Sequence, residues 1–174
     1  MTQDLTMNMI DDAELRELLQ RLRRFALWLT RNASSADDLV QATLERALSR
    51  WGSKGEGNLR AWLFAILYRQ FLDGQRRARR HARLLECFGG RSEEAPSTEE
   101  LVVNQATLAA FARLPAEQRA LLLLVSVEGL SYKEAAEALE IPIGTVMSRL
   151  SRARKALREL AEGEMTNPQL RVLK

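Results

Sequence analysis

The chain has 174 residues, of which 46% are hydrophobic and 6% aromatic, and its formal net charge is +3. This length suits one medium domain or two small ones. A single cysteine excludes an internal disulfide, and one cysteine with one histidine cannot form the usual metal-ligand clusters. No segment offers the roughly 20 apolar residues of a membrane span, and the N-terminus lacks a signal-peptide pattern. We therefore expect a cytoplasmic protein without a metal or cofactor.

The composition favours an all-α fold, because Leu, Ala, Arg and Glu dominate and no alternating strand pattern occurs. The first helix is expected to begin near Asp11, with Glu14 completing a capping box. Apolar positions from Leu15 to Leu29 recur at helical spacing, so they predict one buried face.

A second helix is expected to begin at Ser34 or Ser35. This start would place Asp37 and Asp38 in the first turn, where negative charge suits the helix dipole. The buried side is predicted to comprise Leu39, Leu44, Ala47, Leu48 and Trp51. Residues 52–57 are rich in glycine and predict a loop.

A third, long helix is expected to begin near Asn58, with an apolar first half and a basic second half. The aromatic residues of the first half are Trp62, Phe64, Tyr68 and Phe71, and the arginines that follow are Arg76, Arg77, Arg79, Arg80 and Arg83. Aromatic rings beside arginines can stack unpaired bases, which suits single-stranded or melting DNA. For Trp62 and Phe64 a core role is an equally good interpretation. For the arginines nucleic acid is favoured, because Asp73 is the only acidic residue between Glu56 and Glu86.

Residues 86–100 interrupt the helical pattern with paired glycines, a proline and five glutamates against one arginine, which predicts a flexible acidic linker. It would separate two small helical domains, residues 10–85 and 101–163, with a tail at 164–174. Helix is expected to resume at Ser97 or Thr98. Pro115 suits the first position of a later helix that ends at Gly129.

The end of the second domain predicts a helix-turn-helix. Ser131 and Glu134 form a capping box before a short helix to Leu139, residues 141–144 form a turn, and Thr145 is expected to cap a last helix that continues to about Ala161. Helical periodicity turns Val146, Leu150, Ala153, Leu157 and Leu160 inward and leaves Ser148, Ser151, Arg152 and Lys155 facing out, flanked by Arg149 and Arg154.

The chemistry of this last helix fits DNA. Arginine can bond two acceptors on a guanine edge, and serine can donate or accept there. Residues 145–158 contain five basic side chains and no acidic one. A merely solvated basic face is the alternative, but it does not explain the two-helix spacing and the bounded turn.

Together these features resemble the extracytoplasmic-function (ECF) sigma factors, the smallest group of the bacterial family related to the primary sigma factor. The resemblance covers about Leu15 to Leu160. The matching segments are Ser35–Ala47, Leu59–Ile66, Asp73 with Arg76 and Arg77, Leu114–Arg119, Glu128–Ala136 and Ile143–Arg154.

The resemblance implies that the first domain binds core RNA polymerase through Asp38, Leu39 and Gln41. It also implies that the third helix recognises and opens the downstream (−10) promoter element, and that the last helix reads the upstream (−35) element. The expected downstream set is Trp62, Tyr68, Arg69, Asp73, Arg76, Arg77, Arg79 and Arg80. The expected upstream set is Tyr132, Thr145, Met147, Ser148, Arg149, Ser151, Arg152 and Lys155.

Further partners implied by the resemblance are promoter DNA and an anti-sigma factor, soluble or membrane-anchored, that responds to stress, metal or envelope signals. The chain itself is expected to be monomeric outside complexes, not inserted in membranes and not an enzyme. Arg69 stands where many relatives have Asn, Met147 where several have a basic residue, and Ser151 where some have a bulky one. The promoter preferences of those relatives therefore cannot be transferred.

Two other functions are compatible with parts of this pattern. A stand-alone helix-turn-helix regulator would need no polymerase, but the domain that contains Trp62 and the lack of a sensor domain argue against it. A sigma-mimicking protein that only titrates an anti-sigma factor would have lost the basic groups on both helices, and they are present.

Overall fold

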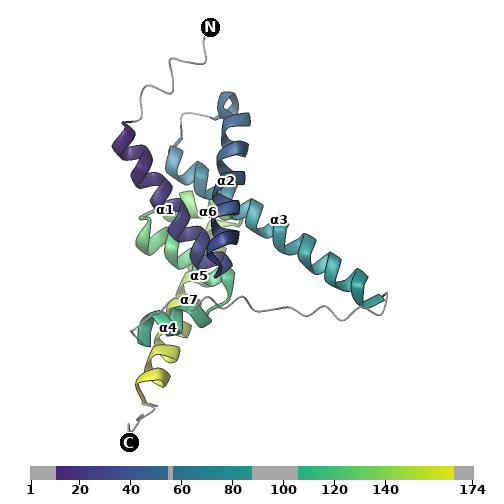
Figure 1. Cartoon of the computed structure of the whole chain (residues 1–174). Helices are drawn as coiled ribbons and strands as arrows, with labels where there is room; N and C mark the ends of the chain where they lie inside the picture. The colour runs from purple at the N-terminus through teal and green to yellow at the C-terminus, as the bar shows by residue number, and fades with distance from the viewer. Residues whose placement is uncertain (1–10, 55–56, 88–105, 167–174) are drawn as a thin grey trace, which may run out of the picture. The chain divides into compact units, whose positions relative to one another are not determined.

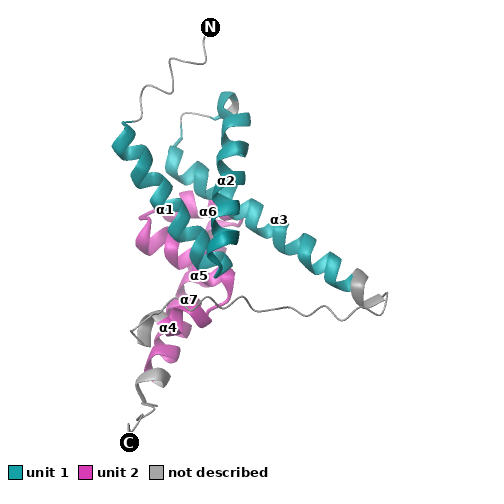
Figure 2. Ribbon diagram, in the orientation of Figure 1, with its two compact units in different colours: residues 1–97 teal, residues 98–174 magenta. Residues whose placement is uncertain are grey.

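The computed structural model describes residues 11–54, 57–87 and 106–166. Every regular element in these ranges is a helix, so the predicted all-α class is confirmed. The chain divides into two compact units, residues 1–97 and 98–174 (Figure 2). The predicted acidic linker lies outside the described residues except for its first two, and so does the expected helix start at Ser97 or Thr98.

Unit 1 contains α1 (Asp12–Thr30), α2 (Ala33–Ser49), a short 3₁₀ turn η2 (Trp51–Ser53) and α3 (Leu59–Cys87) (Figure 1). α1 and α2 pack on each other and on the first half of α3. The rings of Phe25 and Phe64 meet edge to face at 5.1 Å between centroids, and both side chains are buried. The second half of α3 extends beyond α1 and α2 (Figure 1).

The start of α1 differs from the sequence prediction. Asp11 occupies the N-cap position, but its side chain makes no capping hydrogen bond, so the expected box with Glu14 is not formed. α1 ends at Arg31, whose positive φ of 59° turns the chain into α2. There Asn32 is the cap, because its Oδ1 accepts from the backbone N–H of Ser35 at 2.8 Å.

The predicted register of α2 is wrong in two respects. The helix begins at Ala33, so Asp37 and Asp38 lie beyond its first turn. Its fully buried positions are Ala36, Thr43 and Ala47, whereas Leu48 is 64% exposed. One residue advances the helix by about 100°, and Leu48 is thereby turned away from the side that carries Ala47. On α1 the outermost position of the predicted stripe, Leu15, is 40% exposed.

Unit 2 contains α4 (Ala106–Arg113), α5 (Ala116–Leu122), a π-helical turn η3 (Leu123–Val127), α6 (Tyr132–Leu139) and α7 (Ile143–Thr166). α4, α5 and α6 all pack on α7. The apolar core is formed by Leu114, Leu121, Leu124, Val146 and Leu150. The predicted helix stop is present, since Gly129 adopts a φ of 68° after η3, but Pro115 is the N-cap of α5 and not its first residue.

A buried arginine holds the α4–α5 corner of unit 2. Arg119 is 6% exposed and donates from Nη1 to the backbone oxygens of Ala112 and Leu114. These two carbonyls belong to the end of α4 and the following turn, where helix termini leave acceptors without intrahelical partners. The corner that positions α5 against α7 is therefore stabilised by a charge-assisted contact.

Candidate nucleic-acid interface

The helix-turn-helix begins with the capping box predicted from the sequence. Ser131 Oγ accepts from the backbone N–H of Glu134 at 3.2 Å, and the Glu134 carboxylate accepts from the backbone N–H of Ser131 at 2.8 Å. α6 then ends at Leu139, and its C-cap residue Glu140 has a left-handed φ of 54°. The prediction for the next helix start is wrong by three residues: a cap at Thr145 would start the helix at residue 146, but α7 begins at Ile143, and the Thr145 N–H already donates to Pro142 O at 2.8 Å.

α7 has the two faces that its periodicity predicts. Val146, Leu150 and Ala153 are at most 1% exposed and pack inward. The opposite side is exposed and carries Ser148, Ser151, Arg152 and Lys155. Of the further members of the predicted upstream set, Met147 is exposed, whereas Thr145, Arg149 and Tyr132 are half-buried.

Local contacts order part of this face. Ser148 Oγ donates to Thr145 O at 3.2 Å, and Arg152 Nε donates to Ser148 O at 3.3 Å. Arg149 forms an ion pair with Glu117 of α5, with 3.4 Å between Nη1 and Oε2, so part of its guanidinium already has a partner within unit 2. Arg152 is therefore exposed, and its hydrogen bond to Ser148 O already orients its side chain along the helix.

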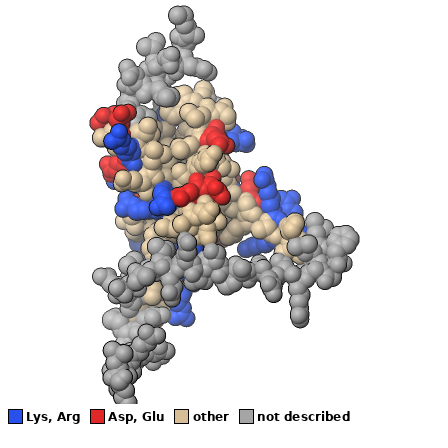
Figure 3. Space-filling model, viewed as in Figure 1, with Lys and Arg blue, Asp and Glu red and all other residues tan. Residues whose placement is uncertain are grey.

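The second half of α3 carries a basic strip made of Arg76, Arg77, Arg79 and Arg80, all of them exposed. Figure 3 shows Lys and Arg side chains gathered along this projecting part of the helix. Asp73 Oδ1 lies 3.5 Å from Arg76 Nη1, and Arg80 Nε donates to Arg76 O at 3.3 Å. The strip is thus a row of cations with one carboxylate at its inner end.

The aromatic residues of α3 occupy two environments. Tyr68 is 5% exposed beside Phe71, with ring centroids 6.4 Å apart, and Phe64 lies in the core. Trp62 is half-buried and meets Trp51 edge to face at 6.2 Å. For Phe64, Phe71 and Tyr68 this geometry matches the core interpretation, whereas Arg69 is exposed on the same helix.

An apolar groove of about 450 Å³ lies between α1 and α2. It is lined by Leu19, Gln20, Arg23, Val40, Gln41, Leu44, Glu45 and Leu48. Of the three residues predicted to bind polymerase, Gln41 lines the groove, Asp38 is exposed nearby on α2 and Leu39 is half-buried. Sequence reasoning missed the groove because it assigned Leu48 to the core.

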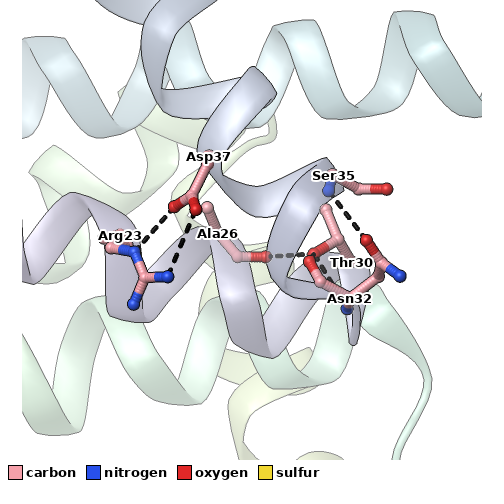
Figure 4. A network of polar contacts seen from close by, with 6 residues as sticks. All are labelled: Arg23, Ala26, Thr30, Asn32, Ser35 and Asp37. Atoms are coloured by element: carbon pink, nitrogen blue, oxygen red, sulfur yellow. Dashed lines mark hydrogen bonds and ion pairs between the residues drawn. The ribbon is translucent and has the colours of Figure 1, made fainter. Parts of the chain in front are cut away.

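An ion pair borders this groove. Arg23 donates to both carboxylate oxygens of Asp37, at 2.6 and 3.2 Å (Figure 4). The hydrogen bond from Arg23, reinforced by its charge, holds the pKa of Asp37 below the usual carboxyl value despite some opposing desolvation. The contact links α1 to α2 a few residues from the Asn32 cap.

The described residues contain neither a candidate metal site nor a candidate membrane span. No His, Cys, Asp or Glu side chains gather there in threes that could hold a metal ion. None of the described helices is long and apolar enough to cross a membrane.

The two units match two known domain families. Residues 15–68 match the sigma2 domain of PhyR, and residues 104–157 match region 4 of sigma-70. The chain is 40% identical over 141 residues to the ECF RNA polymerase sigma factor EcfG of Rhodopseudomonas palustris, covering 80% of this chain and 78% of that protein. It is 35% identical over 163 residues to the ECF sigma factor SigC of Mycobacterium tuberculosis, covering 88% and 83%.

A solved structure shares the fold. The sigma factor RpoE, in complex with the anti-sigma factor NepR from Bartonella quintana, superposes with a TM-score of 0.70 at 36% identity, covering 86% of this chain and 95% of that one. Two helical sigma domains, one with a helix-turn-helix, define a sigma-type transcription factor. The chain belongs to the ECF RNA polymerase sigma factors. This family is a class of transcription regulators and not a known class of enzyme, and the function predicted from the sequence is confirmed at this level.

Proposed function

We propose that this chain joins core RNA polymerase and directs it to promoters, with α7 reading the upstream element and α3 engaging the downstream element. The observation that carries the proposal is the outer face of α7. It exposes Arg152 and Lys155 together with Ser148 and Ser151, on a helix-turn-helix that begins with a capping box and packs Val146, Leu150 and Ala153 inward. A helix fixed in this way can enter the major groove with its first turns against base edges.

On α7, Arg152 is the residue best placed to read a base. Its guanidinium can bond both major-groove acceptors of guanine. Ser148 and Ser151 stand beside it as adaptable donors and acceptors, and Lys155 suits a phosphate. Arg149, Thr145 and Tyr132 would support the edges of this contact, with Arg149 shared between Glu117 and the DNA backbone.

On α3, the basic strip supports a contact with the DNA backbone near the downstream element. Its four arginines can neutralise phosphates on either duplex or separated strands. Arg69 is exposed one turn before Asp73 and would meet bases at the inner end of the strip. Trp62 lies about three turns before Asp73, beside Trp51, and would meet a base there. Tyr68 is buried in this structure, so its part in capturing a base would require a rearrangement of unit 1.

The groove between α1 and α2 supports a polymerase-binding face that includes Asp38, Leu39 and Gln41. An apolar groove lined in part by the exposed Leu48 favours a protein partner, because apolar surface gains from being covered. Gln41 and Asp38 would supply the polar rim that fixes the register of that partner. An anti-sigma factor, of which NepR on RpoE is an example, would compete for such surfaces until a signal releases it.

The chemistry of transcription would rest with the polymerase, and this chain would supply two reading units to it in the cytoplasm. Two modest contacts on one tether combine into a strong one when their spacing fits that of the promoter elements. Opening the downstream element costs a few kcal/mol for each base that leaves the stack. Capture of such bases by unit 1 would offset part of that cost.

The test is transcription in vitro with core polymerase over a promoter library, with and without this chain. Defined start sites that appear only with the chain support the proposal, and their absence overturns it. Arg152→Ala should lose preference within the upstream element. A matched control is Arg24→Ala, which removes an exposed arginine of α1 and should leave that preference unchanged.

A further inference from the structure

Unit 2 exposes three large apolar side chains among its described residues: Val127 at 61%, Met147 at 50% and Ile143 at 46%. A single exposed apolar residue is ordinary and needs no explanation. Ile143 and Met147 differ from Val127 because they lie four residues apart and therefore on adjacent turns of one side of α7. They form an apolar pair at the start of the proposed reading helix.

The position of this pair is the one that approaches bases most closely. Ile143 is the first residue of α7, and Met147 is one turn further on, beside the exposed Ser148 and Ser151. In helix-turn-helix proteins the N-terminal residues of the second helix contact base edges. Long side chains on a helix lean toward its N-terminus, so Met147 is directed to the end that enters the groove.

The major groove offers one apolar recognition group, the 5-methyl of thymine. Methionine suits it, because its flexible and polarizable side chain adapts to irregular apolar surfaces. It has no donors for guanine and no amide for adenine. The surrounding charge fits the same partner, since residues 145–158 contain five basic side chains and no acidic one.

We propose that Met147, supported by Ile143, reads the 5-methyl group of a thymine on either strand of the upstream promoter element. This inference rests on the proposed function, because it requires α7 to occupy the major groove. Arg152 and Met147 would then divide the recognition between them, one by hydrogen bonds and the other by apolar contact. Covering one methyl group is worth about a fourfold change in affinity.

The experiment uses the full chain assembled with core polymerase. A promoter selected from the library is prepared with each upstream thymine replaced in turn by deoxyuridine, which removes only the methyl group. Binding at these positions is compared between wild type, Met147→Ala, Met147→Gln and Met147→Leu. Val127→Ala is the matched control, because it truncates another exposed apolar residue of unit 2, outside α7.

We expect deoxyuridine at one thymine or more to weaken binding about fourfold with wild type and with Met147→Leu and Val127→Ala. Met147→Ala and Met147→Gln should abolish that difference. No deoxyuridine effect in the wild type, or an equal effect in Met147→Ala, would overturn the inference. So would a Met147→Ala defect that is the same on every sequence, which would indicate a protein contact.

The two levels of proposal fail differently in this experiment. If Arg152→Ala loses sequence preference while deoxyuridine has no effect, α7 still reads DNA and only the methyl contact is refuted. If the assembled polymerase shows no preference for any upstream sequence, the proposed function and this inference fall together.

Discussion

The two basic helices of this sigma factor present their charge in different ways. On α7 the cations occupy one face of a helix that α4, α5 and α6 hold from the other side. On α3 they lie along the half that extends beyond α1 and α2 (Figure 1). A clamped helix can hold side chains at fixed positions against base edges, whereas a projecting row of arginines suits phosphates. On this difference we propose that α7 discriminates between sequences and that α3 supplies general affinity.

The largest effects should separate the two units themselves. Phe64→Ala should destabilise unit 1 by about 3–5 kcal/mol, and Leu150→Ala should destabilise unit 2 by about 2–5 kcal/mol, because each leaves a cavity in a packed core. All three tryptophans, at positions 28, 51 and 62, belong to unit 1. Tryptophan fluorescence during urea unfolding should therefore respond to Phe64→Ala and not to Leu150→Ala. An equal response to both would show that the units unfold together.

Arg152→Ala should cost about 1–3 kcal/mol of discrimination at one upstream base pair, because a bidentate contact with that base is lost. The measurement is binding of the assembled polymerase to promoters that vary at single upstream positions. Affinity for the best sequence should fall toward that of its competitors. Undiminished preference at every position would contradict the role given to Arg152.

Neutralising the α3 strip should have a different signature. Arg79→Ala with Arg80→Ala should weaken binding to all sequences alike and flatten the dependence of log affinity on log salt by about 1.4 to 1.8, from two lost phosphate contacts. Titration of salt with one promoter provides the measurement, and Arg152→Ala provides the control for a base-reading arginine. A salt slope equal to that of wild type would remove the phosphate role from these two residues.

The caps of α6 and α1 offer a smaller contrast. Ser131→Ala should destabilise unit 2 by about 1 kcal/mol, because the capping box satisfies two backbone N–H donors at the start of α6. Asp11→Ala should change the stability of unit 1 by less than about 0.5 kcal/mol, since the Asp11 side chain accepts no capping bond. Circular dichroism follows the first variant and tryptophan fluorescence the second. A larger loss from Asp11→Ala would show that its side chain contributes in some other way.

These contrasts also show what could be predicted from the sequence. Predictions from local patterns are confirmed where all the interacting groups are close in the chain. Examples are the capping box between Ser131 and Glu134, the end of α6 and the two faces of α7. At Asp11 the same kind of pattern failed, because a capping residue can be present without adopting the bonded geometry. Thr145 was misassigned as a cap because the chain already turns into helix at Pro142.

Burial was less predictable than helix formation. Leu48 is an apolar residue of the kind that usually fills a core, yet it lines an open groove. Whether an apolar side chain is covered depends on which helix lies opposite it. Tyr68 shows the reverse: as an aromatic ring near the arginines it was predicted to contact unpaired bases, and it is 5% exposed beside Phe71. Contacts between elements decide both cases, and periodicity within one helix carries no information about them.

The smallest expected effect concerns the ion pair between α1 and α2. Because Arg23 lowers the pKa of Asp37 in the folded state, the contact should stabilise unit 1 fully above the ordinary carboxyl pKa and lose its effect as pH falls through the lowered value. Asp37→Asn should therefore be less stable than wild type at neutral pH, and the difference should shrink in acid. Tryptophan fluorescence across a pH series measures it.

Asp38→Asn is the matched control for this last contrast, since it removes a neighbouring exposed carboxylate and keeps the pair with Arg23. It should retain the pH dependence of the wild type, whereas Asp37→Asn should not. Both side chains of the pair are more than half exposed, so salt should weaken its contribution as well. Parallel stability curves for wild type and Asp37→Asn from neutral pH into acid would mean that the contact adds nothing to unit 1. Its α1–α2 face would then be held by the buried apolar contacts alone.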